Sequence, residues 1–361
     1  MKWITLLLLG NCLFHEFANA QGCIAARNIS GFGQYNLTDN AFTTSDWQLN
    51  INSRYFKAFR DFRGKEDQNT TKQNEAIITS FAIDFSISKL MRNGWSLNLS
   101  LPIASNSREA SVEHGGPNTT RHTTRSFGLG DVRFTAYKWL LAPTPKQKAN
   151  VQLGLGLKLP TGDYKYQDFF YRNDSIKVLS AVNPSIQLGD GGTGIITELN
   201  VFYILNPART ISFYGNFYYL INPREQNGTA FTAGRIPSRL DSLANNILLS
   251  VPDQFSMRAG VYFNFRNWAV STGLRNEGSP VKDLVGGNGG TRRSGYNLSI
   301  DPGIIYKMKN FSVYAFVPIV LDRKICQNLP DKFKTAYTGV YTVSPGGSGN
   351  YQVFLGALFK L

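Results

Sequence analysis

Apolar residues alternate with polar or small residues along much of this chain. In residues 77–87, for example, Ile77 and Phe81 would share one face of a strand, while Ser80 and Asp84 would share the other. Successive side chains of a β-strand point to opposite faces, so a period of two predicts strands with one apolar side. The pattern predicts twelve strands, at residues 47–60, 75–89, 94–105, 129–142, 149–160, 193–206, 209–222, 254–265, 267–276, 296–308, 310–322 and 350–361.

The segments between these strands alternate between long and short. Long polar segments such as 106–127 and 161–192 are separated by short turns such as 90–94 and 142–147. Membrane β-barrels have long loops on the extracellular rim and short turns on the periplasmic rim. The predicted fold class is therefore all-β: a transmembrane antiparallel up-and-down β-barrel of about 12 strands, with short periplasmic turns and long extracellular loops.

A soluble β-sandwich or lipocalin-like barrel is the alternative fold, because its strands alternate too. The predicted strands are, however, much longer than the usual soluble strand of about five or six residues. The chain also ends in an alternating strand. Tryptophans lie near strand ends, like the interfacial aromatic girdle of membrane barrels: Trp47, Trp95, Trp139 and Trp268. We therefore predict a multi-pass β-barrel in the outer membrane of a Gram-negative bacterium.

The N-terminal residues have the features of a secretory signal peptide. Lys2 precedes the apolar run 3–9, and Ala18-Asn19-Ala20 would form the cleavage site. The run is too short to span a bilayer as a helix. The predicted domains are a signal peptide at 1–20, an N-terminal lead-in or possible lumen plug at 21–45, and the barrel at 46–361.

The polar face of the predicted strands carries both acids and bases. An Arg or Lys facing lipid at mid-bilayer would cost about 2–4 kcal/mol, so charged mid-strand residues are assigned to the lumen. Their near balance favours ion pairs that brace the wall over a positively lined anion pore. The predicted lumen-lining residues are Arg54, Asp84, Asp131, Arg133, Tyr137, Lys158, Glu198, Tyr214, Tyr218, Arg258, Tyr262, Arg275, Asp301 and Tyr314.

Some positions leave two interpretations open. The lumen tyrosines would either line a narrow passage for a small aromatic compound or simply fill the interior, because twelve strands lie between filled small barrels and open porins. Lys57 and Lys138 break the alternation, but each is near a strand end, where a long side chain can reach the interface. Asp131, Asp163 and Asp253 are interpreted as turn residues whose carboxylates bind backbone amides.

Seven short motifs occur in order along the barrel segment: GLGDV (128–132), LPTGDY (159–164), SVPDQF (250–255), GLRNEGSPVKDLVGG (273–287), TRRSGY (291–296), DPG (301–303) and FVPIVLDRK (316–324). In this order the chain resembles, over residues 46–361, outer-membrane β-barrels described as transporters of the meta-pathway of phenol degradation, in a Bacteroidota-like form. The resemblance implies an outer-membrane channel for passive uptake of small hydrophobic or aromatic compounds. It implies no catalytic residues.

The chain is basic, with 38 Lys and Arg residues against 24 Asp and Glu residues and a net charge of +14. Nucleic acid is not a predicted partner, because the basic residues are dispersed and the chain is predicted to be exported. The expected partners are outer-membrane lipid and lipopolysaccharide, whose phosphates would meet basic loops, a small hydrophobic or aromatic solute, and the barrel assembly machinery.

Two other functions stay open from the sequence. A structural or adhesive barrel with a plugged lumen would use the long loops as its binding surface. An outer-membrane lipase needs a nucleophile within reach of a base, and the mature chain has only His114 and His122, both in a predicted loop. We predict no enzyme activity, no catalytic residue, no cofactor and no metal site. Whether Cys23 and Cys326 pair is also left open.

Overall fold

The computed structural model describes residues 47–361, except for residues 69, 70, 73, 145, 146, 174, 345 and 348. The predicted signal peptide at 1–20, the lead-in or plug at 21–45 and Cys23 lie outside the described residues. Cys326 is buried. Whether the two cysteines pair therefore stays open, and the division of the chain into domains stays a prediction.

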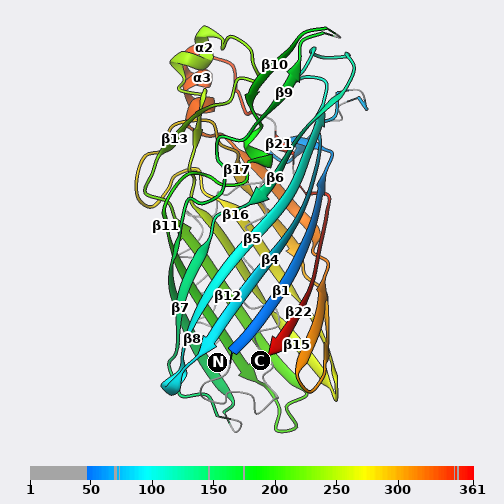
Figure 1. Cartoon of the computed structure of the whole chain (residues 1–361), viewed down its shortest axis with the longest axis vertical. Helices are drawn as coiled ribbons and strands as arrows, with labels where there is room; N and C mark the ends of the chain where they lie inside the picture. Colours follow the sequence, from blue (N-terminus) through cyan, green and yellow to red (C-terminus); the bar gives the residue numbers. More distant parts are fainter. Residues whose placement is uncertain are drawn as a thin grey trace.

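The wall of the molecule is a closed antiparallel β-barrel (Figure 1). The first strand, β1 (Trp47–Ala58), pairs with β4 (Ile77–Leu90) on one side and with the last strand, β22 (Tyr351–Lys360), on the other, which closes the wall. Strands that follow one another in the chain lie side by side. The remaining wall strands are β5 (Trp95–Ala110), β6 (His122–Leu129), β7 (Arg133–Trp139), β8 (Ala149–Lys158), β11 (Gly194–Ile204), β12 (Ile211–Ile221), β15 (Gln254–Phe265), β16 (Trp268–Ser279), β17 (Ser294–Ile300), β18 (Gly303–Lys307), β19 (Phe311–Phe316) and β20 (Ile319–Cys326).

Three positions of the wall are each made of two consecutive strands, so the fifteen strands of this sheet form the predicted barrel of 12. Both β6 and β7 pair with β5, and both β17 and β18 pair with β16. The third divided position is β19 and β20. Pro302 and Pro318 lie at two of the breaks, where the lack of a proline N–H interrupts the ladder.

The third and fourth wall positions rise further than the sequence predicts. β5 continues to Ala110, and β6 begins at His122, whereas the sequence predicts a loop over residues 106–127. The two strands pair along this extension, from Ile103 with Leu129 to Ala110 with His122. The interpretation as a loop was wrong for residues 106–110 and 122–127. Apart from Ala110 and Phe127 these residues are polar, so apolar alternation does not mark them as strand.

The two ends of the barrel differ as predicted. The described chain begins and ends at the end with the short turns, while the long segments rise above the other end (Figure 1). One short turn contains η1 (Arg92–Gly94). The long segments contain folded elements: β2 (Asp61–Arg63), β3 (Glu66–Asp67), β9 (Gln167–Tyr171), β10 (Lys177–Ala181), η2 (Pro184–Ile186), β13 (Gln226–Ala230), α2 (Arg239–Leu243), β14 (Leu248–Ser250), α3 (Leu329–Thr338) and β21 (Gly346–Gly347).

The outer surface of the barrel is apolar and its inside is mostly polar. On β8, Leu153, Leu155 and Leu157 are 46%, 63% and 48% exposed, whereas Gln152 and Lys158 are 6% and 2% exposed. A soluble barrel has the opposite arrangement, so the outward leucines identify a transmembrane barrel. Among the described residues, no helix is long and apolar enough to cross a bilayer.

Three of the four tryptophans of the predicted girdle lie on the outer surface of the barrel. Trp47, Trp95 and Trp268 are exposed, but Trp139 is buried. Trp139 pairs across the β7–β8 ladder with Gln152, an inward residue, so its ring points into the barrel too. There it packs edge-on against Phe202, with ring centroids 5.7 Å apart. A position near a strand end does not indicate whether the side chain points into the barrel or out of it.

Candidate functional site

The barrel interior is the candidate site, because the predicted lumen-lining residues come together there. Arg133 is partly exposed, and the others are buried: Arg54, Asp84, Asp131, Tyr137, Lys158, Glu198, Tyr214, Tyr218, Arg258, Tyr262, Arg275, Asp301 and Tyr314. They come from strands all around the wall. That they line a route for a solute stays a prediction.

One cluster of charges is centred on Asp301, at the break between β17 and β18. Its Oδ2 accepts from Arg258 Nε at 2.7 Å and lies 3.3 Å from Arg275 Nη2. Arg275 Nη1 is 3.3 Å from Glu277 Oε2. Two guanidinium groups thus face two carboxylates, and the cluster is close to neutral.

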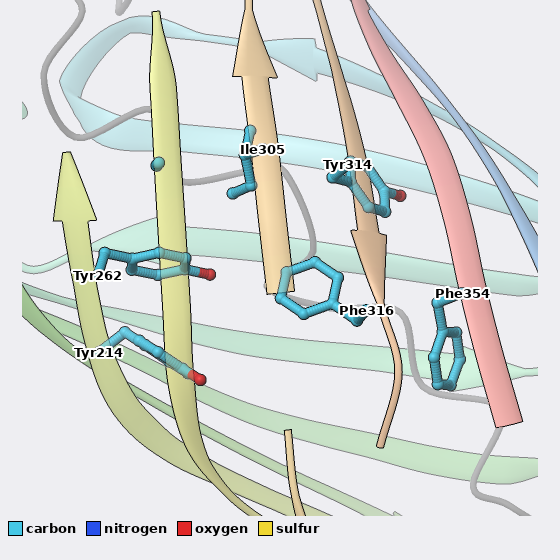
Figure 2. Packing of buried hydrophobic residues seen from close by; sticks show 7 residues of the cluster. Tyr214, Tyr262, Ile305, Tyr314, Phe316 and Phe354 are labelled. Atoms are coloured by element: carbon cyan, nitrogen blue, oxygen red, sulfur yellow. The ribbon is translucent and has the colours of Figure 1, made fainter. Parts of the chain in front are cut away.

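Aromatic rings surround these two arginines. The guanidinium carbon of Arg258 lies 5.6 Å from the centroid of the Tyr214 ring and 5.0 Å from that of Phe316. Arg275 lies 4.8 Å from the centroid of the Phe354 ring. Figure 2 shows these rings pointing into the interior beside Tyr262 and Tyr314. Guanidinium groups are attracted to aromatic faces, so the charges and the rings form one packed cluster. We call these residues the aromatic–arginine cluster: Tyr214, Arg258, Tyr262, Arg275, Glu277, Asp301, Tyr314, Phe316 and Phe354.

Glycines on neighbouring strands make room for the rings. A Cβ on Gly356 would lie 2.3 Å from the Tyr314 ring, and a Cβ on Gly303 would lie 2.3 Å from the Phe316 ring. A Cβ on Gly154 would likewise lie 2.7 Å from the Tyr137 ring. Inward glycines therefore let the rings lie flat against the wall, where any larger residue would collide with them.

A second group of charges lies around Lys158. Its ammonium contacts Asp190 and is 3.5 Å from Asp131 Oδ2. Asp131 also accepts hydrogen bonds from the backbone N–H groups of Gly162 and Asp190, at 3.0 and 3.2 Å. Asp131 thus binds backbone amides, as its interpretation as a turn residue predicts. Glu198 accepts a hydrogen bond from the Tyr137 hydroxyl at 3.1 Å.

Sequence reasoning missed two acids of these clusters. Glu277 lies one residue beyond the predicted end of the ninth strand, although it keeps the inward phase of Arg275. A longer search for alternation would have found it. Asp190 belongs to a long segment between β8 and β11, and no periodicity indicates that its side chain reaches Lys158.

Carboxylates at the extracellular rim organise the long segments. Asp253 accepts from the backbone N–H groups of Asn222 and Leu284 at 2.7 and 2.8 Å, in agreement with the predicted turn role. Asp283 forms two bonds to Arg292, at 2.9 and 2.8 Å. Burial raises the pKa of both carboxyls, against the lowering effect of these bonds. The third predicted turn aspartate, Asp163, accepts from the Lys165 N–H at 2.9 Å.

The two histidines pack a loop together. His114 Nδ1 accepts a hydrogen bond from the Tyr171 N–H at 3.0 Å, and the His122 ring stacks on the Tyr171 ring at 4.2 Å. Burial, followed by the nearby His122, lowers the pKa of His114 to about 4. Within the described residues neither imidazole bonds to a serine hydroxyl, and no group of three or more His, Cys, Asp or Glu residues is placed to hold a metal. The backbone hydrogen bond of His114 and the ring stacking of His122 identify both as packing residues.

No protein-family model matches the chain, and no curated protein matches it. Among solved structures it is similar to an outer membrane channel from Pseudomonas putida F1, with a TM-score of 0.60 and 10% identity over 89% of this chain and 97% of that one. It is more weakly similar to the translocator domain of the autotransporter NalP from Neisseria meningitidis (TM-score 0.44, 9% identity, 89% and 91% covered). Its similarity to the toluene transporter TbuX from Ralstonia pickettii is comparably weak (TM-score 0.41, 11% identity, 94% of this chain and 96% of that one covered). The first similarity shows that this chain has the fold of an outer-membrane barrel, and at this identity it shows the fold alone.

Proposed function

We propose that the protein is an outer-membrane channel through which small hydrophobic or aromatic compounds diffuse passively. The observation that supports this most is the aromatic–arginine cluster, which combines flat apolar rings with paired charges inside a membrane barrel. Its neutrality gives free ions little attraction. Its rings and guanidinium groups offer faces on which a planar aromatic solute can stack.

The same cluster is tightly packed, which limits the kind of passage that is possible. Tyr214 and Arg275 are each 1% exposed, and Phe316 is fully buried. A solute would have to displace these side chains rather than enter a wide water-filled pore. We therefore expect small and intermittent conductance, together with permeation by compounds that compete for contacts with the rings. The fold shared with the P. putida channel is consistent with such a role.

Reconstitution tests this proposal. The folded protein is placed in planar bilayers for conductance and in liposomes for uptake of phenol, benzoate and a sugar of similar size. Phe316→Ala removes an inward ring of the cluster and should raise conductance and aromatic uptake several-fold. Phe265→Ala, which removes an exposed ring from the outer surface, is the control and should change neither. Phe316→Leu gives a milder opening if the alanine variant does not fold.

The proposal fails if the wild-type protein and Phe316→Ala both stay silent and impermeable, or if the sugar crosses as fast as phenol. A silent barrel would favour the alternative, a structural or adhesive protein. One observation supports that second function. The extracellular helix α3 and the residues after it carry exposed Phe333, Tyr337, Val340 and Tyr341, a ridge of the kind that adhesive surfaces use.

A further inference from the structure

Two neighbouring sheets at the extracellular end, strand β6 of the barrel wall and the β9–β10 hairpin, expose both apolar and cationic side chains. Phe127 of β6, Phe169 of β9 and Leu179 of β10 are 68%, 42% and 52% exposed. Arg125 and Lys177 stand exposed on the same strands as Phe127 and Leu179, two positions away in each case. A period of two places Arg125 on the face of Phe127 and Lys177 on the face of Leu179. Leu179 lies opposite Phe169 in the β9–β10 ladder, so each of the two neighbouring sheets presents apolar and cationic side chains together. We call these five residues the β6–β10 face.

The β9–β10 hairpin is fixed to the barrel wall by Asp168. One oxygen of its carboxylate accepts from the backbone N–H of Arg125 at 2.7 Å, and the other accepts from the N–H of Phe169 at 2.8 Å. The ammonium of Lys177 lies 4.5 Å from the centroid of the Phe169 ring. The hairpin therefore presents its cation directly above an apolar ring.

The carboxylates close to this face are engaged elsewhere. Both oxygens of Asp168 bind backbone amides, and Glu109 pairs with Arg121 at 3.1 Å. Within the part of the chain that the structure describes, no ion pair involves Arg125 or Lys177. The two cations are thus available to an external anion.

The β6–β10 face also continues the lipid-facing surface of the barrel. Leu129 lies opposite Ile103 in the β5–β6 ladder, and both are exposed. One step further up, Phe127 lies opposite Ser105, and then Arg125 lies opposite Ser107. The outer surface therefore changes from wholly apolar to apolar and cationic at the extracellular end of the wall.

We propose that the β6–β10 face binds the phosphorylated glycolipid of the outer leaflet, with acyl chains against Phe127, Phe169 and Leu179 and a phosphate on Arg125 and Lys177. Arginine and lysine are the side chains that bind phosphate most strongly. Continuity with the lipid-facing wall makes a membrane lipid, rather than a soluble anion, the occupant. The inference depends on the outer-membrane location in the proposed function but not on transport.

The test measures retention of bisphosphorylated lipid A by the folded protein in detergent, using native mass spectrometry. The double variant Arg125→Glu with Lys177→Glu should lower the bound fraction about tenfold. Phe127→Ser should lower binding of lipid A with or without its phosphates. Lys282→Glu, a charge reversal at an exposed position in another long segment, is the control for each single variant, Arg125→Glu and Lys177→Glu, and should bind as the wild type does. If the double variant does not fold, as judged by its heat-dependent gel shift, the Gln pair replaces it.

The inference is overturned by equal retention by the double variant, by equal loss in Lys282→Glu, or by equal wild-type binding of dephosphorylated lipid A. Displacement by phosphatidylglycerol at the same concentration also overturns it, because the site would then accept any anionic lipid. Conductance is measured separately in bilayers without glycolipid. A conducting barrel that retains no lipid A refutes only this inference, and a silent barrel that retains it refutes only the proposed channel.

Discussion

Replacing Asp301 with asparagine tests whether the barrel interior is packed as the structure shows. The carboxylate is 0% exposed and faces Arg258 and Arg275, whose side chains are 2% and 1% exposed. Asparagine has nearly the same shape, so the substitution removes charge and little volume. The cluster then changes from two cations and two anions to two cations and one anion.

The expected cost follows from the burial of the cluster. Removing one partner of a buried ion pair typically costs about 3–5 kcal/mol, because the remaining charge loses its compensation in a medium that solvates it poorly. Arg275 keeps Glu277 as a partner at 3.3 Å, so we expect a loss of about 3 kcal/mol for Asp301→Asn. Asp322→Asn is the control. Its pair with Lys65, at 2.8 Å, has side chains 36% and 57% exposed, and such exposed pairs contribute little to stability because water screens them.

The assay is urea unfolding of both variants and the wild type in detergent, followed by tryptophan fluorescence and by the heat-dependent gel shift of folded barrels. Asp301→Asn should unfold at clearly lower urea than the wild type, and Asp322→Asn should stay close to the wild type. Equal midpoints for the two variants would refute the reasoning. They would mean that the interior charges are well solvated, and that the packed cluster does not limit passage.

Two further predictions concern the glycines and the histidine. Gly356→Ala puts a Cβ 2.3 Å from the Tyr314 ring and should lower the free energy of unfolding by about 1–3 kcal/mol in the same urea assay. In the control Gly215→Ala the nearest atom to the new Cβ is 3.8 Å away, so stability should hardly change. Equal effects of the two substitutions would contradict the ring placement. The pKa of His114 is about 4 in the folded protein and about 6.5 when unfolded, so its packing should contribute fully to stability above about pH 7. That contribution should fall by at most about 3 kcal/mol as the pH falls from about 6.5 to about 4, and should change no further below that. Hydrogen exchange at the Tyr171 amide, corrected for intrinsic rates, should show this opening in the wild type and not in His114→Gln; the same pH profile in both would exclude His114 as the cause.

Alternation along the chain was enough to predict the barrel, and the reason is physical. A wall that separates lipid from a crowded interior imposes opposite requirements on successive residues, and those requirements appear in sequence with a period of two. The outward Leu155 and the inward Lys158 could therefore be assigned without a structure. The prediction for Trp139 was wrong because it used distance from the strand end; the alternation puts Trp139 on the inward face of Tyr137.

Contacts between segments were beyond the reach of this rule, as Asp190 illustrates. Its carboxylate meets Lys158 because a long segment folds back into the extracellular end of the barrel, and a lysine buried without a partner would be expensive. The sequence shows that Lys158 points inward, so it shows that a counterion is needed. It does not show which of the acids in the long segments supplies it.

The interior packing depends on register, which alternation also leaves undetermined. The sequence places glycines and aromatic residues on the inward face of neighbouring strands, but only the pairing of Tyr314 with Gly356 across β19 and β22 puts a ring where no Cβ stands. A shift of that ladder by two residues would keep both side chains facing inward, yet Tyr314 would then meet Phe354 or Leu358 in place of glycine. Space for the ring is lost in either case. The glycines therefore do more than enlarge the interior: by admitting a ring at one pairing and excluding it at the next, they select the register, and with it the positions at which rings and arginines meet.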